Sequence, residues 1–301
     1  MMNHHVVRGD ATRRRRHASA LGAALGCGVL LLGVASASPA VASGSHSHRG
    51  ADYVALGDSY TSGPLIPRQV DANCARSDQN YPSLVATRRP TRSFTDVSCA
   101  GATTDDMWNA QGTNGPQLNA VERSTDLVTV QIGGNDIGFG SIIGTCAALS
   151  SKDPSGNPCQ QYYNSSGFDQ LTRNIIETAP KLARVLRAVH DRAPHARVLV
   201  VGYPDLLPDD GSGCYPSVPF AAKDFAYLRD VGKRLNLMMR TVALFSRAKY
   251  VDTYKPTVGH DMCKAPADRW IEPLQPASPA APAHPNAKGE AAMAGAVLRR
   301  L

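Results

Sequence analysis

Three short apolar segments, each followed by glycine, constrain the fold of this 301-residue chain more than any other feature. They are residues 53–56, 127–132 and 197–201, and the glycines are Gly57, Gly133 and Gly202. Short, mainly apolar runs closed by glycine predict strands that are buried on both faces, as in a parallel sheet covered by helices. The carboxyl ends of these strands are where functional groups are expected.

Helical patterns lie between and after these segments. Apolar side chains recur at three- and four-residue steps over residues 171–189 and 225–242, and Pro194 should end the first of these helices. A last helix is expected at about 286–300. The polar, glycine-rich segment 141–167 is interpreted as an excursion tied by a disulfide. Strands alternating with helices predict an α/β fold, a three-layer α/β/α sandwich with a central parallel sheet.

The first 42 residues are typical of an export signal. A basic block at residues 13–16 precedes an apolar run at 18–34 and small-residue sites that end at Ala37 and Ala42. We expect cleavage after Ala42, a mobile polar tail at 43–50 and a single domain at 51–301. A membrane anchor is the weaker alternative, because the run is shorter than the roughly 20 apolar residues of a spanning helix.

Charge and cysteine content fit an exported chain without a metal. Removing the leader, with five arginines and one aspartate, lowers the net charge from +7 to +3, which gives no case for nucleic-acid binding. Six cysteines remain after Cys27 is lost, and an even number in an exported chain predicts disulfides. No metal or cofactor is expected, since zinc-ligand spacings, P-loop and Rossmann patterns are missing from the sequence. The expected pairs follow sequence order: Cys74–Cys99, Cys146–Cys159 and Cys214–Cys263.

Ser59 lies in the turn Gly57-Asp58-Ser59-Tyr60, directly after the first predicted strand. A tight turn that begins at glycine can present a serine at the sheet edge with its backbone N–H free. This turn is not the G-x-S-x-G nucleophile elbow, because Thr61 stands two residues after the serine. An ordinary turn serine is the alternative for this motif alone, and Asp58 is expected to have a structural role in the turn.

Three further motifs could complete a site with Ser59. Gly101, in Ala100-Gly101-Ala102, could direct a backbone N–H into a cleft. Asn135, after Gly133-Gly134, offers a side-chain N–H donor, and His284 stands on a loop before the last helix. Each of these has a structural alternative when taken alone: a turn glycine, a turn asparagine or a surface histidine.

Taken together, the four motifs resemble the SGNH, or GDSL, hydrolase family. The matching stretches, residues 53–63, 100–102, 132–136 and 284–286, span nearly all of the mature chain. The cysteines and the leader make the chain most similar to secreted actinobacterial lipases, esterases and phospholipases of this family. The resemblance implies a flavodoxin-like fold, with Ser59 as nucleophile and His284 as general base. It also implies an oxyanion hole formed by the N–H groups of Ser59 and Gly101 and the amide of Asn135.

The chain departs from the family pattern at one position. Many members carry an aspartate three residues before the histidine, where this chain has Ala281. We therefore expect a Ser–His dyad in which the main-chain carbonyl of Ala281 or Pro282 orients the imidazole. The alternative is a triad completed by Asp261 or Asp268.

The predicted function is a secreted, extracellular carboxylic-ester hydrolase acting on lipids or other acyl esters through an acyl-serine. A polysaccharide O-acetyl esterase and an acyltransferase remain open on the same site. A secreted binding module that has lost catalysis is disfavoured by the intact set of four motifs. We expect a monomer with no stable membrane anchor after cleavage and no nucleic-acid partner. Acyl-chain length, regioselectivity and the choice between lipase, phospholipase and small-ester esterase are left open.

Overall fold

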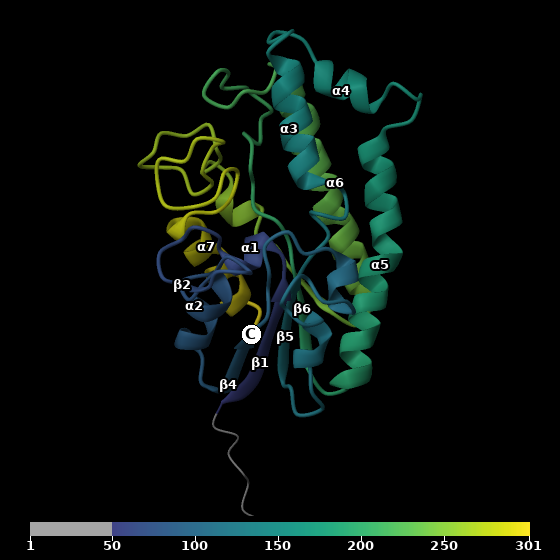
Figure 1. The fold of residues 1–301 in the computed structure, drawn as a ribbon, viewed down its shortest axis with the longest axis vertical. Helices are drawn as coiled ribbons and strands as arrows, with labels where there is room; N and C mark the ends of the chain where they lie inside the picture. The colour runs from purple at the N-terminus through teal and green to yellow at the C-terminus, as the bar shows by residue number, and fades with distance from the viewer. Residues whose placement is uncertain (1–49) are drawn as a thin grey trace, which may run out of the picture. The chain divides into compact units, whose positions relative to one another are not determined.

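The computed structural model describes residues 50–301 (Figure 1). The predicted signal sequence, its cleavage site and all of the predicted tail except Gly50 lie outside the described residues. Within residues 50–301, no helix is both long enough and apolar enough to cross a membrane.

A five-stranded sheet forms the centre of the domain, with strand order β4-β1-β5-β6-β7 and every neighbouring pair parallel. The three buried strands that the sequence predicts are the three central strands, β1, β5 and β6. The two outer strands were not predicted, because β4 is polar and β7 has only three residues. The strands are β1 (Ala51–Gly57), β4 (Thr91–Asp96), β5 (Leu127–Gln131), β6 (Arg197–Val201) and β7 (Lys249–Val251).

Helices cover both faces of this sheet (Figure 1). Alternate residues of a strand point to opposite faces, so Val54 and Leu56 pack in the core under α5 and α6, whereas Tyr53 and Ala55 pack against α2 and α7. The predicted three-layer α/β/α class is therefore confirmed. The covering helices are α2 (Tyr81–Arg88), α5 (Gln170–Arg192), α6 (Asp224–Phe245) and α7 (Ala287–Leu298).

The predicted helices are present, and local chemistry sets their ends. Asp169 caps α5 by accepting from the Leu171 N–H, and α5 ends two residues before Pro194, as predicted. The Asn286 side chain caps α7 by accepting from the N–H groups of Lys288 and Gly289, so this helix begins one residue later than expected.

Segment 141–167, interpreted as an excursion tied by a disulfide, does carry the Cys146–Cys159 bond and is also partly helical. The segment overlaps α3 (Phe139–Ser150) and contains α4 (Pro158–Tyr163). Ile142, Cys146 and Ser150 are buried at four-residue spacing along α3, which is a helical signal that the glycines and polar residues obscured. The remaining elements are α1 (Ser59–Ser62), β2 (Gln69–Asp71), β3 (Arg76–Ser77), η1 (Thr104–Met107), η2 (Gln117–Ala120) and η3 (Lys255–Thr257).

Three disulfides join the pairs that the sequence analysis expected. Cys74–Cys99 lies beside the carboxyl end of β1, and Cys146–Cys159 ties α3 to α4. Cys214–Cys263 joins the loop before α6 to the loop after η3, across 49 residues of sequence. The first and third of these crosslinks hold loops around the carboxyl end of the sheet, where the candidate site lies.

Candidate active site

The register of the sheet brings the serine and asparagine motifs together. Gly57 at the end of β1 pairs with Gln131 at the end of β5, so the chain leaves both strands side by side. Ser59 is then the first residue of α1, whose N-terminus is capped by Asp58 accepting from the Tyr60 N–H at 2.9 Å. A Cβ at Gly57 would lie 2.8 Å from the Gln131 carbonyl oxygen and within 2.6 Å of Thr61, which explains the glycine before the turn.

His284 reaches the serine from the loop before α7. Its Nε2 lies 2.7 Å from the Ser59 Oγ, and its Nδ1 lies 2.7 Å from the Pro282 carbonyl oxygen. A carbonyl can only accept, so the contact with Pro282 places the ring hydrogen on Nδ1 and leaves Nε2 free to accept from the serine hydroxyl. Of the two expected carbonyls, Pro282 therefore contacts the ring, while Ala281 accepts from the His284 backbone N–H at 3.2 Å.

Among residues 50–301, no carboxylate hydrogen-bonds the imidazole of His284. Its two ring nitrogens contact only Ser59 and Pro282 there. Asp261 instead forms an ion pair with Lys264 at 3.6 Å, and the backbone carbonyl of Asp268 contacts the ring of His260 at 2.5 Å. The geometry therefore supports a dyad rather than a triad.

Aromatic rings enclose the imidazole. The Tyr60 ring stacks on it with centroids 4.7 Å apart, and the Phe139 ring meets it edge-on at 5.8 Å. Tyr60 also fixes the loop, because its hydroxyl donates to the Ala283 carbonyl at 2.6 Å. Burial in this apolar setting lowers the pKa of His284 to about 4, and the hydrogen bond to the Pro282 carbonyl opposes that shift. The imidazole is thus neutral at neutral pH, as a general base must be.

A buried polar cluster around Glu272 also holds the loop that carries His284. Glu272 donates its N–H to the His284 carbonyl at 2.9 Å, and its carboxylate accepts from the Asn286 side chain at 2.8 Å. The same carboxylate lies 3.2 Å from Arg269. Glu272 is fully buried, so this cluster fixes both ends of the short segment that carries His284. Glu272 and Arg269 were not singled out from the sequence, because neither belongs to a recognisable motif.

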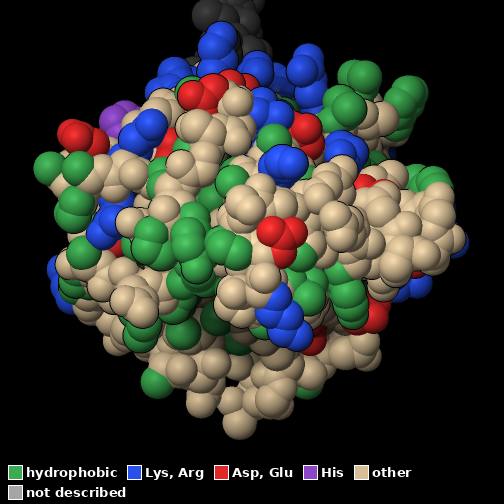
Figure 2. Space-filling model, turned by 90° about the horizontal axis from the view of Figure 1, so that it is seen from above, with side chains coloured by type: hydrophobic (Ala, Val, Ile, Leu, Met, Phe, Trp, Pro, Cys, Tyr) green, Lys and Arg blue, Asp and Glu red, His purple; other side chains and the backbone are tan. Residues whose placement is uncertain are grey.

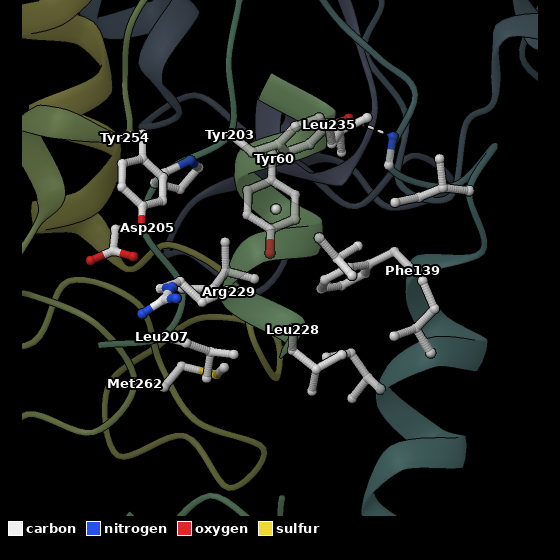
Figure 3. Close-up of a pocket in the computed structure, with 18 of the residues that line it drawn as sticks. Tyr60, Phe139, Tyr203, Asp205, Leu207, Leu228, Arg229, Leu235, Tyr254 and Met262 are labelled. Carbon is white, nitrogen blue, oxygen red and sulfur yellow. Dashed lines mark hydrogen bonds between the residues drawn. The ribbon is translucent and has the colours of Figure 1, made fainter. Parts of the chain in front are cut away.

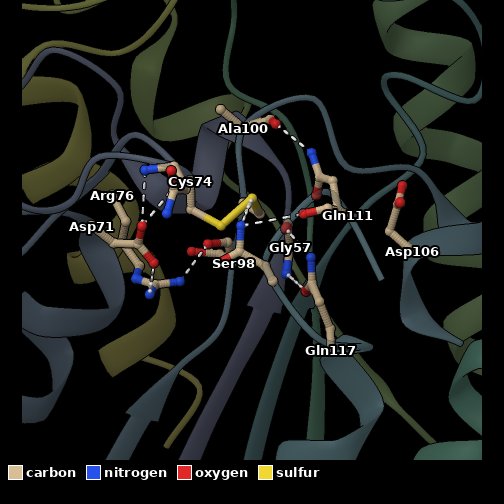
Figure 4. The surroundings of a disulfide bond; sticks show 12 residues. Gly57, Asp71, Cys74, Arg76, Ser98, Ala100, Asp106, Gln111 and Gln117 are labelled. Carbon is tan, nitrogen blue, oxygen red and sulfur yellow. Dashed lines mark hydrogen bonds and ion pairs between the residues drawn. A yellow bond between two sulfur atoms is a disulfide. The ribbon is translucent and has the colours of Figure 1, made fainter. Parts of the chain in front are cut away.

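Gly101 lies on a loop that the first disulfide holds against β1 (Figure 4). The Cys99 N–H donates to the Gly57 carbonyl at 3.0 Å, and the Gln111 side chain donates to the Ala100 carbonyl at 2.7 Å. Gly101 itself has a φ of +81°, a left-handed conformation that favours glycine. Among residues 50–301, neither its N–H nor that of Ser59 has a protein acceptor, so both are free to bind an oxyanion.

Asn135 supplies the third donor. Its Nδ2 donates one hydrogen to the Ala102 carbonyl at 2.8 Å, which orients the amide and leaves the second hydrogen available. Asn135 lines the same cleft as Ser59, Gly101 and His284. The structure therefore places all four residues singled out from the sequence around one cleft.

Tyr203 connects the turn that carries Ser59 to the glycine that precedes Asn135. Its buried hydroxyl accepts from the Gly134 N–H at 2.8 Å and donates to the Asp58 carboxylate. Burial raises the pKa of Asp58 to about 7, and the hydrogen bond from Tyr203 opposes that shift. Asp58 therefore has the structural role expected of it, whereas Tyr203 was missed because it stands alone in the sequence after β6.

An apolar cavity of about 90 Å³ opens beside the cleft (Figure 3). Ser59, Asn135 and Phe139 line both spaces. Figure 2 views the domain from above, onto the end that carries these loops, and shows hydrophobic side chains gathered in the middle of this face. Trp270 stacks on His260 and lines neither space. Other apolar residues of the cavity come from α3, α6 and the loops beside them: Ile142, Ile143, Leu207, Leu228, Leu235 and Met262.

Comparison with known proteins agrees with this geometry. The model of the GDSL-like lipase/acylhydrolase family matches residues 55–292. Lipase 2 of Streptomyces coelicolor is 41% identical in an alignment 275 residues long that covers 89% of this chain and 91% of that protein.

Solved structures show the same relationship. The crystal structure of phospholipase A1 from Streptomyces albidoflavus superposes with a TM-score of 0.71 at 28% identity, covering 84% of this chain and 100% of that one. An extracellular lipase from Streptomyces rimosus superposes with a TM-score of 0.68 at 30% identity, covering 83% of this chain and 99% of that one. The chain therefore belongs to the GDSL-like lipase/acylhydrolase family and is an ester hydrolase of the lipase and esterase type.

Proposed function

We propose that the chain hydrolyses carboxylic esters of lipids through an acyl-Ser59 intermediate formed by a Ser59–His284 dyad. The observation that carries the proposal is the continuous contact from the Pro282 carbonyl through the imidazole to the Ser59 Oγ, with 2.7 Å at each step. This arrangement sets the tautomer, aims Nε2 at the hydroxyl and needs no carboxylate to do so.

Each step of the reaction has a group in place. Ser59 Oγ attacks the ester carbonyl carbon while His284 Nε2 takes its proton. The N–H groups of Ser59 and Gly101 and the amide of Asn135 would hold the developing oxyanion. Collapse of the tetrahedral intermediate breaks the bond to the alcohol oxygen, which receives the proton from His284. A water molecule then repeats the sequence on the acyl-serine and releases the acid.

The apolar cavity favours a lipid acyl chain over a small acetyl group. Ser59 is among the residues that line it, and its walls between α3 and α6 are mainly aliphatic and aromatic. Burying an acyl chain there removes apolar surface from water, at about 0.8 kcal/mol for each CH₂ group. The similarity to a phospholipase A1 and to lipases supports the same substrate class.

We also propose that the protein acts outside the cell after residues 1–42 are removed. Three disulfides among residues 50–301 are typical of an oxidising compartment. The name of the Streptomyces rimosus relative, an extracellular lipase, supports export of this chain as well.

Organophosphate labelling tests the proposal directly. The folded, disulfide-intact protein should take up one phosphonyl group per molecule, and peptide mass mapping should place it on Ser59. Prior incubation with a short p-nitrophenyl ester should slow the labelling, because substrate and label compete for the same hydroxyl. No label on Ser59 in active protein, or a label on another serine, would contradict the proposed nucleophile.

Substitution of Asn135 with alanine should lower kcat for p-nitrophenyl butyrate about 10²–10³-fold, since one oxyanion donor is lost. KM should change little, because the donor acts mainly on the charge that develops in the transition state. The matched control is Asn109→Ala, which removes an exposed asparagine whose side chain hydrogen-bonds the Asp105 carbonyl four residues earlier and should leave kcat within about twofold. Steady-state kinetics on both variants make the comparison, and an unchanged kcat in Asn135→Ala would exclude this donor.

A further inference from the structure

Asp205 places a carboxyl group in the wall of the apolar cavity. It follows β6, is fully buried and lines the same cavity as Ser59 (Figure 3). Its backbone is fixed by a hydrogen bond from its N–H to the Thr257 hydroxyl at 2.8 Å. Neither of its carboxyl oxygens has a hydrogen-bond partner within the described residues.

The polar side chains near Asp205 form hydrogen bonds and ion pairs with other residues. The Tyr254 hydroxyl lies beside it in Figure 3 but donates to Asp209 at 2.8 Å. Arg229 also lines the cavity, yet its guanidinium contacts the Asp230 carboxylate at 2.8 Å and the Asp209 carbonyl at 3.0 Å. Lys233 pairs with Asp209 at 2.6 Å. Within residues 50–301 the contacts of these neighbours go to other residues, so the cavity leaves room for a bound molecule to serve as the partner of the carboxyl.

The chemistry of Asp205 suits a neutral hydroxyl. Burial raises the pKa of Asp205 to about 7; the nearby Tyr254 hydroxyl, although it donates to Asp209, opposes that shift, and the carboxylates of Asp261 and Asp209 add to it. The carboxyl can thus accept from a hydroxyl when ionised and donate to one when protonated. A cationic ligand fits less well, because the Arg229 guanidinium lines the same part of the cavity.

A buried carboxyl without a partner is costly, whereas a leucine at this place would extend the apolar wall formed by Leu207, Leu228 and Met262. We infer that Asp205 is a specificity residue that hydrogen-bonds a hydroxyl group on the acyl chain of the substrate, so that hydroxylated acyl esters are preferred to plain ones. This inference rests on the proposed acyl-Ser59 chemistry.

The experiment compares p-nitrophenyl decanoate with a series of p-nitrophenyl hydroxydecanoates that carry the hydroxyl at successive positions. The wild-type protein should show a kcat/KM about tenfold higher for one or two positions of the hydroxyl than for the plain ester, as one hydrogen bond to a charged group allows. Asp205→Leu should abolish that preference and raise kcat/KM for the plain ester. Asp205→Asn should keep part of the preference, and the exposed Asp210→Asn should keep all of it.

Equal rates for all positions in the wild type would overturn the inference and would leave water as the partner of the carboxyl. A preference that survives in Asp205→Leu would overturn it too. Failure of the dyad chemistry is distinguishable, since it would remove hydrolysis of p-nitrophenyl acetate, whose acyl group carries no hydroxyl for Asp205 to bind. Thermal unfolding should show Asp205→Leu at least as stable as the wild type, because an unpartnered buried carboxyl is removed.

Discussion

Substitution of Ser59 with alanine is expected to reduce kcat for p-nitrophenyl butyrate by about 10⁶, the scale seen when a serine nucleophile is removed from a working pair. The loss follows from the geometry, because Ser59 Oγ is the only hydroxyl that contacts His284 among residues 50–301. The fold should survive, since the cap of α1 is provided by Asp58 and not by Ser59. Burst and steady-state release of p-nitrophenol measure the effect, and thermal unfolding checks the fold.

Ser62→Ala is the matched control for this experiment. Ser62 is also buried in α1, three residues further on, and its Oγ has no hydrogen-bond partner within the described chain. Its removal should leave kcat within about twofold. Residual activity in Ser59→Ala above about 1% of the wild type, in protein free of contaminating esterase, would contradict the role of Ser59 as nucleophile.

The central strands and the four motif residues could be predicted because their signals are local. Residues 53–56 and 127–132 are mainly apolar runs followed by glycine, and the motifs of Ser59 and Asn135 follow those ends directly. Strand β4 could not be read this way, because an edge strand is buried on fewer sides and its sequence, TRSFTD, is mostly polar.

The residues that were missed depend on partners far away in sequence. Tyr203 acts on Asp58 and Gly134, which lie 145 and 69 residues from it. Glu272 stabilises the histidine loop only because the chain folds back to place His284 beside it. Asp205 is unusual only in relation to the apolar walls around it. Such relations have no sequence period or motif, so they emerge only from the folded chain.

Substitution of His284 with alanine is expected to lower kcat by about 10⁶, close to the effect of Ser59→Ala, because base and nucleophile act as one unit. The double variant should then be no slower than either single variant. Asp261→Asn and Asp268→Asn are the controls for a hidden triad and should leave kcat nearly unchanged, since neither carboxylate contacts the imidazole. A decrease in kcat of about 10⁴-fold in either of these variants would show that a carboxylate does complete the site.

The pH profile separates the role of His284 as a base from a merely structural one. Burial lowers the pKa of His284 to about 4, so the base is neutral and active above that pH and is lost as the pH falls through it. The acid limb of kcat/KM should therefore lie near pH 4, with a tenfold loss per unit below it. An unfolded histidine titrates near 6.5, so protonation favours the unfolded chain increasingly as the pH falls from about 6.5 to 4. Initial rates on freshly diluted protein are needed for this reason, and an acid limb near pH 6.5 would contradict the buried, neutral base.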